Sequence, residues 1–155
     1  MTGAAQQALR PVLFRFQYGI KILMNEDSIF VFEISYLLDV IEKVLLGTIF
    51  HEHHSYHSIK PLKKFFNNFD MELIDITRNN IQGGSLVGVV QFKKGKYKID
   101  NSVQETLMIE QKKKIDEVET LKVFAKDLDI TKQKVKSLFN EIVQQKKIIA
   151  GFGAA

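Results

Sequence analysis

The stretch IFVFEI at residues 29–34 decides the fold class, because its almost uninterrupted apolar side chains are rich in β-branched and aromatic types. Such a run is typical of a strand that is buried on both faces of a parallel sheet. The single acid of the run, Glu33, stands near the carboxyl end of the predicted strand, the end at which open α/β sheets bind their ligands. The sequence therefore predicts an α/β fold with this strand inside the sheet.

The segments around this strand alternate between helical and extended patterns. Met71–Arg78 and Ser85–Phe92 alternate as strands across a turn at Asn79–Gly84, so we expect them to pair antiparallel. Gly47 is placed to end one helix, and Pro61 to occupy the first position of another. In chain order, the predicted helices are Pro11–Met24, Leu37–Leu46, Pro61–Phe69, Val103–Lys114 and Leu121–Lys147.

The last predicted helix and the segment after it also carry apolar patterns. The helix has apolar side chains at the spacing of a core-facing stripe. A buried strand is then predicted over Lys147–Gly153, leading into a Gly-Phe-Gly turn. The residues of the stripe are Phe124, Leu128, Val135, Leu138, Phe139, Ile142 and Val143.

Composition excludes several classes of protein and of site. The chain has 155 residues, 45% of them hydrophobic, and a net charge of +4, which is too small an excess to predict nucleic-acid binding. It contains no cysteine, so disulfides, thiolate metal sites and a cysteine nucleophile are excluded. No apolar run is long enough to span a membrane, and the first residues do not form a secretory signal. We therefore expect a cytoplasmic protein with neither a nucleic-acid nor a membrane partner.

All four histidines lie within seven positions, at His51, His53, His54 and His57, with Glu52 among them. Histidine titrates near neutral pH, so a cluster beside a carboxylate suits general acid–base catalysis. Imidazole and carboxylate groups are also metal ligands, but this close spacing disfavours a metal site. A surface loop without catalytic function is the third interpretation, and the residues alone leave all three open.

The glycine motifs are less specific than the histidine cluster. Gly83-Gly84-Ser85 could let the backbone approach a ligand closely, although its spacing favours a simple hairpin turn. Gly151-Phe152-Gly153 is half of a dinucleotide-binding pattern. The sequence contains neither a P-loop nor a Gly-x-Ser-x-Gly nucleophile motif, so it does not support a P-loop kinase or an α/β-hydrolase.

Four motifs that occur in order along the chain carry a resemblance to a known family. They are Ile29–Asp39, Thr48–Tyr56, Ile81–Leu86 and Ile149–Ala154. Together they resemble the S-adenosylmethionine-dependent sugar C-methyltransferases that act on nucleotide-linked deoxysugars, and the resemblance covers roughly residues 12–155.

The resemblance implies two domains of α/β type. Residues 12–100 would form the C-terminal half of a class I methyltransferase domain, which has a Rossmann-like sheet that ends in an antiparallel strand pair. Residues 101–155 would begin a C-methyltransferase C-terminal domain with helices and its first strand. Residues 1–11 match neither part.

The resemblance also implies a reaction and the residues that carry it. A base removes a proton from a carbon next to a sugar ketone, and S-adenosylmethionine donates the methyl group. By this carry-over His53 is the candidate base, Glu52 orients or polarises it, and His51 belongs to the same motif. The candidate substrate-binding residues are Phe50, Tyr56, Gly84 and Ser85.

The chain departs from the family pattern at several points. Phe50 stands where the family usually has tyrosine, and Val87 where an arginine commonly follows the Gly-Gly-Ser-Leu stretch. The glycine-rich loop for the cofactor has no counterpart, so we expect the chain to resemble an internal part of a longer enzyme that is inactive alone. The alternative is a non-catalytic assembly module that self-associates through exposed sheet edges, with Lys60–Phe69 and Ile148–Phe152 as its docking features.

Overall fold

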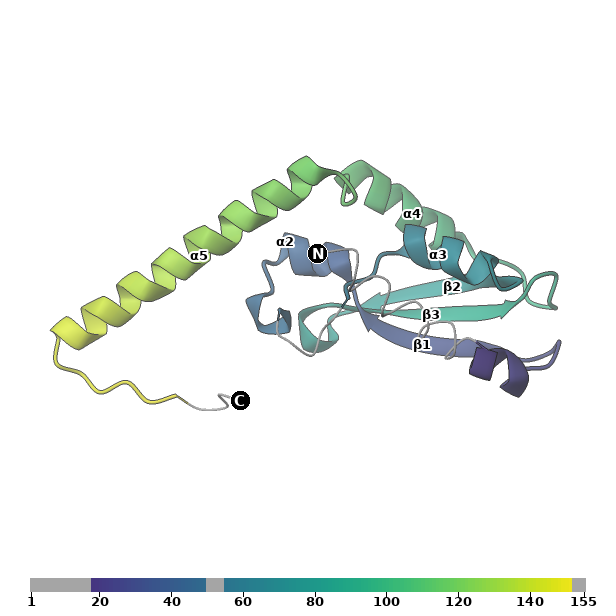
Figure 1. Cartoon of the computed structure of the whole chain (residues 1–155), viewed down its shortest axis with the longest axis horizontal. Helices are drawn as coiled ribbons and strands as arrows, with labels where there is room; N and C mark the ends of the chain where they lie inside the picture. Colours follow the sequence, from purple (N-terminus) through teal and green to yellow (C-terminus); the bar gives the residue numbers. More distant parts are fainter. Residues whose placement is uncertain (1–17, 50–54, 152–155) are drawn as a thin grey trace.

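A computed structural model of the chain describes residues 18–49 and 55–151. Its centre is a three-stranded antiparallel sheet in the order β1-β3-β2 (Figure 1). The strands are β1 (Phe30–Ser35), β2 (Met71–Asn79) and β3 (Ser85–Phe92). Because β1 and β2 are each antiparallel to β3, the two outer strands run in the same direction, and their carboxyl ends lie at the same edge of the sheet.

Helices connect and cover these strands. Between β1 and β2 the chain forms α2 (Leu37–Glu42), the short 3-10 helix η1 (Leu46–Thr48) and α3 (Ile59–Asn67). A second 3-10 helix, η2 (Ile81–Gly83), makes the turn from β2 to β3. After β3 come α4 (Asn101–Lys113) and α5 (Val118–Gln144).

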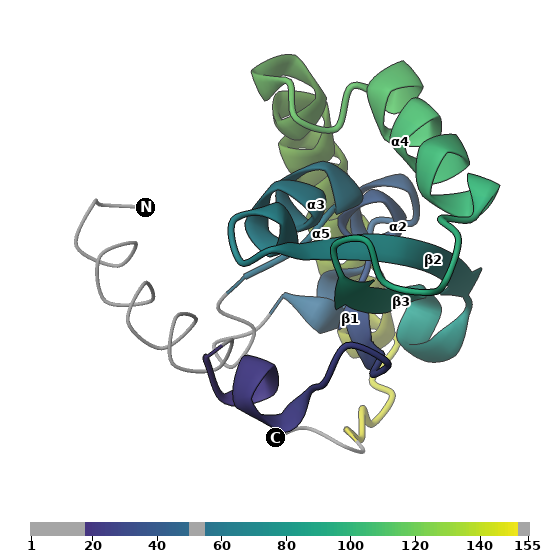
Figure 2. The ribbon, with the colours of Figure 1, turned by 90° about the vertical axis from the view of Figure 1, so that its right-hand side faces the viewer.

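The hydrophobic core lies between the sheet and the helices α3 and α4, which cover the same face (Figure 2). Alternate residues of β1 point to this face, and the ring of Phe32 lies 5.4 Å from that of Phe66 in α3. Gly88 of β3 is opposite Phe32 in the sheet, and a Cβ there would overlap with that ring, so a glycine is required. Burial of these aromatic side chains is the main driving force for the fold.

The structure corrects the prediction that residues 29–34 form a strand buried on both faces of a parallel sheet. β1 is antiparallel to its one partner among the described residues, and Val31 on its second face is 52% exposed. The apolar run was misinterpreted because three of its side chains are needed to meet α3, while the others face outward. The α/β class is confirmed, and a Rossmann-like sheet stays a prediction.

Most of the other predicted elements are confirmed with shifted ends. The antiparallel pair of β2 and β3 is confirmed, and β3 has the predicted bounds. The helix predicted over Leu37–Leu46 stops at Glu42, because Val44 has the left-handed backbone value φ 48°, which ends the helix. Pro61 is the third residue of α3 and not its first. Of Pro11–Met24, residues 18–24 are described, and residues 18–23 are helical.

Two predictions for the C-terminal part are wrong. α5 forms, but none of its residues is buried in the described structure, so its apolar stripe does not face a core. Residues 147–151 form no strand, and Ile148 is 96% exposed. Both patterns have the apolar spacing of buried elements, yet no residue of α5 or of residues 147–151 is buried in the described structure. Phe152 and Gly153 lie outside the described residues.

The division into domains at residue 100 stays a prediction. In the structure, Val103 of α4 is buried in the core and α4 packs against β2 and α3. The first helix of the segment predicted as a second domain therefore shares the core of the sheet.

Candidate active site

The residues predicted to act on the substrate lie mostly outside the described part of the chain. These are Phe50, His51, Glu52 and His53, which fall within residues 50–54. The described residues on either side of that stretch, together with the sheet edge beside them, define the candidate site.

Hydrogen bonds join the two flanks of the histidine-rich stretch to each other and attach the second flank at the carboxyl end of β1. The Tyr56 hydroxyl donates to the backbone carbonyl of Thr48 over 2.8 Å, which ties the residues before the stretch to those after it. The backbone amide of Leu37 donates to the His57 carbonyl over 3.0 Å, and Tyr36 and His57 form a parallel β-bridge. The segment after the stretch is thus fixed beside the last residues of β1.

A polar cluster occupies the same edge of the sheet, on the face that the helices leave open. The Ser85 hydroxyl lies 2.5 Å from Glu33 Oε1 and 2.7 Å from Asn79 Oδ1. A hydroxyl has one proton, and a charged acceptor makes the stronger bond, so Ser85 is assigned as a donor to Glu33. Ser85, one of the predicted substrate-binding residues, is only 6% exposed, and its hydroxyl proton is directed to Glu33.

The glycine pair at the turn is required by close packing. Gly84 is buried, and a Cβ on it would overlap with the side chain of Asp39. Gly83 has φ 90°, a value that glycine adopts readily, and the Leu45 side chain packs against it. The structure thus supports the interpretation of Gly83 and Gly84 as residues of a tight turn. A role for Gly84 in binding substrate stays a prediction.

An ion-pair network around the buried carboxylate of Asp39 lies behind this turn. Arg78 in β2 donates from Nε and Nη2 to the two carboxylate oxygens of Asp39, each over 2.9 Å. The Asp39 side chain has no exposed surface and also pairs with Lys43 Nζ at 2.6 Å. Burial opposes the ionisation of Asp39, but the hydrogen bonds from Arg78 and Lys43 outweigh it and hold the pKa of the carboxyl below its usual range.

The network continues from β2 to α4. Arg78 Nη2 also lies 3.2 Å from Glu42 Oε2, and Lys113 Nζ lies 2.6 Å from Glu42 Oε1. The hydrogen bond from Lys113 is the main reason that the pKa of Glu42 is lowered. These pairs fix α2, β2 and α4 relative to one another next to the candidate site.

A second buried acid joins α4 to the start of α3. Glu110 is 3% exposed, and its carboxylate accepts hydrogen bonds from the backbone amides of Ile59 and Lys60 at 2.6 and 3.1 Å. The first amides of a helix have no partner within it and carry positive potential, so a carboxylate is stabilised there. The Tyr36 hydroxyl donates to the same carboxylate over 3.1 Å. Burial and the charge of Glu110 raise the pKa of Tyr36.

An apolar pocket of about 460 Å³ lies between β1 and α3, with Glu33 and His57 among its polar lining residues. Burial lowers the pKa of His57, because desolvation disfavours the imidazolium. His57 Nε2 lies 3.0 Å from the hydroxyl of Ser55. The other lining residues are Ile20, Phe30, Phe32, Ile34, Pro61, Leu62, Phe65 and Phe66.

Sequence analysis missed the residues that hold this site together. Asp39, Arg78 and Glu110 are ordinary charged residues in the sequence. Arg78 is 39 positions from its partner Asp39, and Glu110 is 74 positions from its partner Tyr36. Asp39 ends the first of the four motifs and has apolar neighbours on both sides, which was the one available signal. Polar residues follow Arg78 and Glu110, and no local pattern marks either of them.

The described residues set two limits on the site. In residues 18–49 and 55–151, no group of three or more histidine, aspartate or glutamate side chains is placed to hold a metal ion. Across the same ranges, every helix is too short or too polar to cross a bilayer.

Comparison with known proteins identifies relatives of this chain. Residues 80–155 match the family described as the C-methyltransferase C-terminal domain. The chain is also 29% identical to C-methyltransferase NovU of Streptomyces niveus over 136 residues, which are 88% of this chain and 32% of NovU. The chain therefore spans about a third of the length of this curated relative. The resemblance identified from the four sequence motifs is confirmed.

Proposed function

Because this chain is a relative of the C-methyltransferases, we propose that it supplies the proton-abstracting part of an S-adenosylmethionine-dependent enzyme that methylates a carbon of a nucleotide-linked keto-deoxysugar. The substrate class comes from the motifs around the histidine cluster. The proposal concerns the part of the reaction that residues of this chain can perform, which is the activation of a C–H bond.

One observation carries the proposal: the segment after the histidine-rich stretch is attached at the carboxyl end of β1, and the segment before the stretch is attached to it in turn. The bond from Leu37 to His57 makes the first attachment, and the bond from Tyr56 to Thr48 makes the second. In open α/β sheets this edge is where ligands bind. A base that lies between these attachments in the sequence, such as His53, is well placed to act on a substrate at this edge.

The proposed chemistry is a proton transfer from carbon. A neutral imidazole of His53 takes the proton from the carbon next to the sugar ketone, and the electron pair of the C–H bond moves into an enolate. Histidine suits this task because its pKa lies near neutral pH, and Glu52 would stabilise the imidazolium that forms. Donors near the ketone oxygen would stabilise the developing negative charge.

The Gly83-Gly84 turn does not offer a cradle for S-adenosylmethionine, the methyl donor that the family relationship suggests. Gly84 is buried against the side chain of Asp39, and the Leu45 side chain packs beside Gly83. We therefore place no step of the reaction on contacts between the cofactor and these residues.

Exchange of carbon-bound hydrogen tests the proposal without the methyl donor. The chain is incubated in D₂O with a thymidine-diphosphate-linked 4-keto-6-deoxyhexose, and NMR follows deuterium entering the carbons next to the ketone. The chain should accelerate exchange at one of these carbons, and His53→Ala should reduce the acceleration by at least about 100-fold, the usual contribution of a general base. His54→Ala is the matched control and should retain most of the acceleration.

Two results would contradict the proposal. An unmodified chain that leaves the exchange rate at its value in buffer would show that these residues do not activate the C–H bond. Equal losses in the two histidine variants would remove the specific role of His53.

A second candidate function is assembly, and a different observation favours it. The outer edge of β1 pairs with no other strand in the described residues, and an open edge can accept a strand from another chain. The Phe-rich helix is a poorer docking feature than expected, because Phe66 is buried and Phe65 and Phe69 pack against the core.

A further inference from the structure

The exposed apolar side chains of the long C-terminal helix lie in a regular pattern. α5 has 27 residues, which gives a length of about 40 Å, and none of them is buried in the described structure. It extends from the sheet as a separate arm (Figure 1). A helix of this length with an amphipathic sequence normally gains its stability by packing its apolar face.

The apolar residues repeat every seven positions. Leu121, Leu128, Val135 and Ile142 are spaced by seven, and Phe124, Thr131 and Leu138 follow each of the first three by three positions. These are the a and d positions of a heptad repeat, the pattern of a two-stranded coiled coil. We call these seven residues the seam.

Thr131, the one polar residue of the seam, can also be buried in an interface. The Thr131 hydroxyl donates to the carbonyl of Asp127 in the same helix over 2.9 Å. Its hydrogen-bonding demand is thus met, and burial of its methyl group leaves no polar atom unsatisfied.

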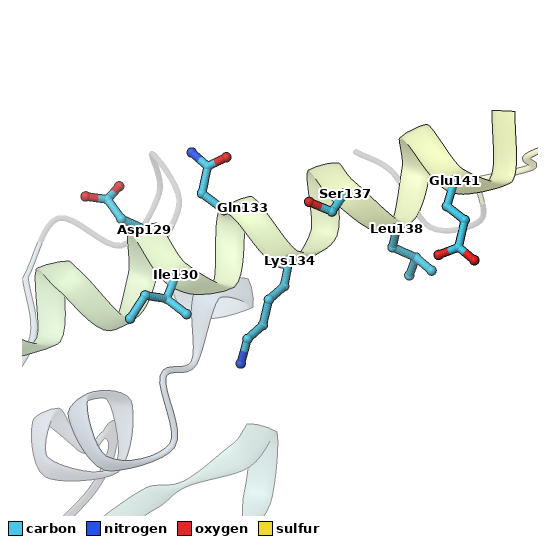
Figure 3. Close-up of a pocket in the computed structure, with 7 residues that line it drawn as sticks. All are labelled: Asp129, Ile130, Gln133, Lys134, Ser137, Leu138 and Glu141. Carbon is cyan, nitrogen blue, oxygen red and sulfur yellow. The ribbon is translucent and has the colours of Figure 1, made fainter. Parts of the chain in front are cut away.

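The hollow beside the seam is a surface of this helix alone. A shallow depression of about 610 Å³ is lined only by residues of α5. Figure 3 shows Ile130, Lys134 and Leu138 pointing to the same side of the helix. No second element of the described chain closes this depression, and Leu138 is the one seam residue in its lining.

The charges that flank the seam favour a second copy of this helix as the occupant. We propose that α5 forms a parallel, in-register coiled coil with α5 of a second chain. In that arrangement Asp127 lies beside the partner's Lys132, and Lys134 lies beside the partner's Phe139, which its aliphatic stem can cover. Each of these two charged side chains then faces a side chain of the partner that is either opposite in charge or apolar.

The parallel orientation also uses the whole seam. An antiparallel pair that places Lys134 beside the partner's Asp127 sets Ile142 beyond the first residue of the partner helix. The antiparallel pair that places Lys134 beside the partner's Glu141 instead leaves Leu121 beyond the partner helix's last residue. The in-register parallel pair buries all seven seam positions, which span three and a half heptads, within the three to four heptads that indicate a coiled coil.

The association state of the chain in solution tests whether a second copy of α5 covers the seam. Sedimentation equilibrium of the full chain should give twice the chain mass at about 100 μM, with dissociation on dilution. Leu128→Glu, which places a charge in the seam, should give a monomer. Gln133→Glu, which places the same charge on the opposite face of α5, should remain a dimer. A monomeric parent chain, or a dimer that Leu128→Glu leaves intact, would overturn the proposal.

The absence of native cysteine gives a direct test of orientation. In the parallel pair, Leu121→Cys brings two thiols together, and mild oxidation should link the chains in high yield. In either antiparallel pair the two thiols would be about 25 Å or more apart, which is too far for a disulfide. Gln133→Cys, on the outer face, should link far less. Equal yields for the two variants would contradict the parallel coiled coil.

Discussion

The three-stranded sheet with the helices α2, α3 and α4, which we call the sheet unit, differs from α5 in what its apolar residues contact. In the sheet unit, Tyr36, Leu86 and Val90 are fully buried, and the buried acids Asp39 and Glu110 have specific partners. In α5, comparable side chains such as Leu138 remain about half exposed. The difference teaches that the sheet unit is self-contained in its packing, whereas the stability of α5 depends on what it binds.

The largest expected difference between the regions concerns their ion pairs. Arg78→Met removes the bidentate partner of Asp39, whose side chain is fully buried, and should lower the free energy of unfolding by about 3 kcal/mol. Lys122→Ala breaks the exposed Lys122–Glu119 pair in α5 and should cost less than about 0.5 kcal/mol. Urea denaturation of the two variants measures both values.

The pH dependence of stability gives the same comparison a second readout. The pKa of Asp39 is lower in the folded chain than in the unfolded chain, so its contribution is present above the unfolded pKa and is lost as pH falls through the folded pKa. Stability should therefore fall below about pH 4, and less steeply in Arg78→Met. Equal slopes for the parent and this variant would show that Arg78 does not hold the carboxylate ionised.

Glycine substitutions should give the next largest effect. Gly84→Ala places a methyl group against Asp39 and should destabilise the chain by about 2 kcal/mol, as overpacking of a core does. Gly47→Ala introduces a methyl group with open space around it, so its effect should be within about 0.5 kcal/mol. Thermal unfolding of both variants tests the turn interpretation, which requires that Gly84→Ala have the clearly lower midpoint.

The smallest expected effect involves His57. Burial lowers its pKa in the folded chain, so protonation favours the unfolded chain, and stability should begin to fall as pH drops through the ordinary histidine value of about 6.5. NMR titration of the His57 ring should give a pKa below that value. A pKa at or above it would mean that the pocket beside α3 is open to water at this residue.

The sequence predicted the helices and strands themselves better than it predicted which of their faces are covered. β3 was predicted with its observed bounds, because a strand that alternates beside a glycine turn carries its own local signal. The run around Phe32 was assigned to the interior of a parallel sheet because periodicity reports which side chains are apolar and not how many faces are covered. The stripe along α5 was assigned to a core for the same reason.

The candidate site shows a similar division. The attachment of its flanks through Tyr56 and Thr48 lies within one local segment, and Tyr56 was among the predicted residues. The Arg78–Asp39 and Glu110–Tyr36 contacts join segments far apart in the chain, so no motif could have identified them. The roles of His51, Glu52 and His53 stay predictions, since these residues lie outside the described part of the chain.

The most direct test of the account is the position of residue 53 relative to β1. A nitroxide label on His53→Cys is the only thiol adduct in the chain, because no native cysteine competes with it. The account predicts strong paramagnetic broadening of the backbone amide signals at Ser35 and Tyr36, and much weaker broadening at Phe30 at the other end of the strand. Broadening centred on Phe30, or on neither end, would contradict the placement of the histidine-rich stretch at the carboxyl end of β1.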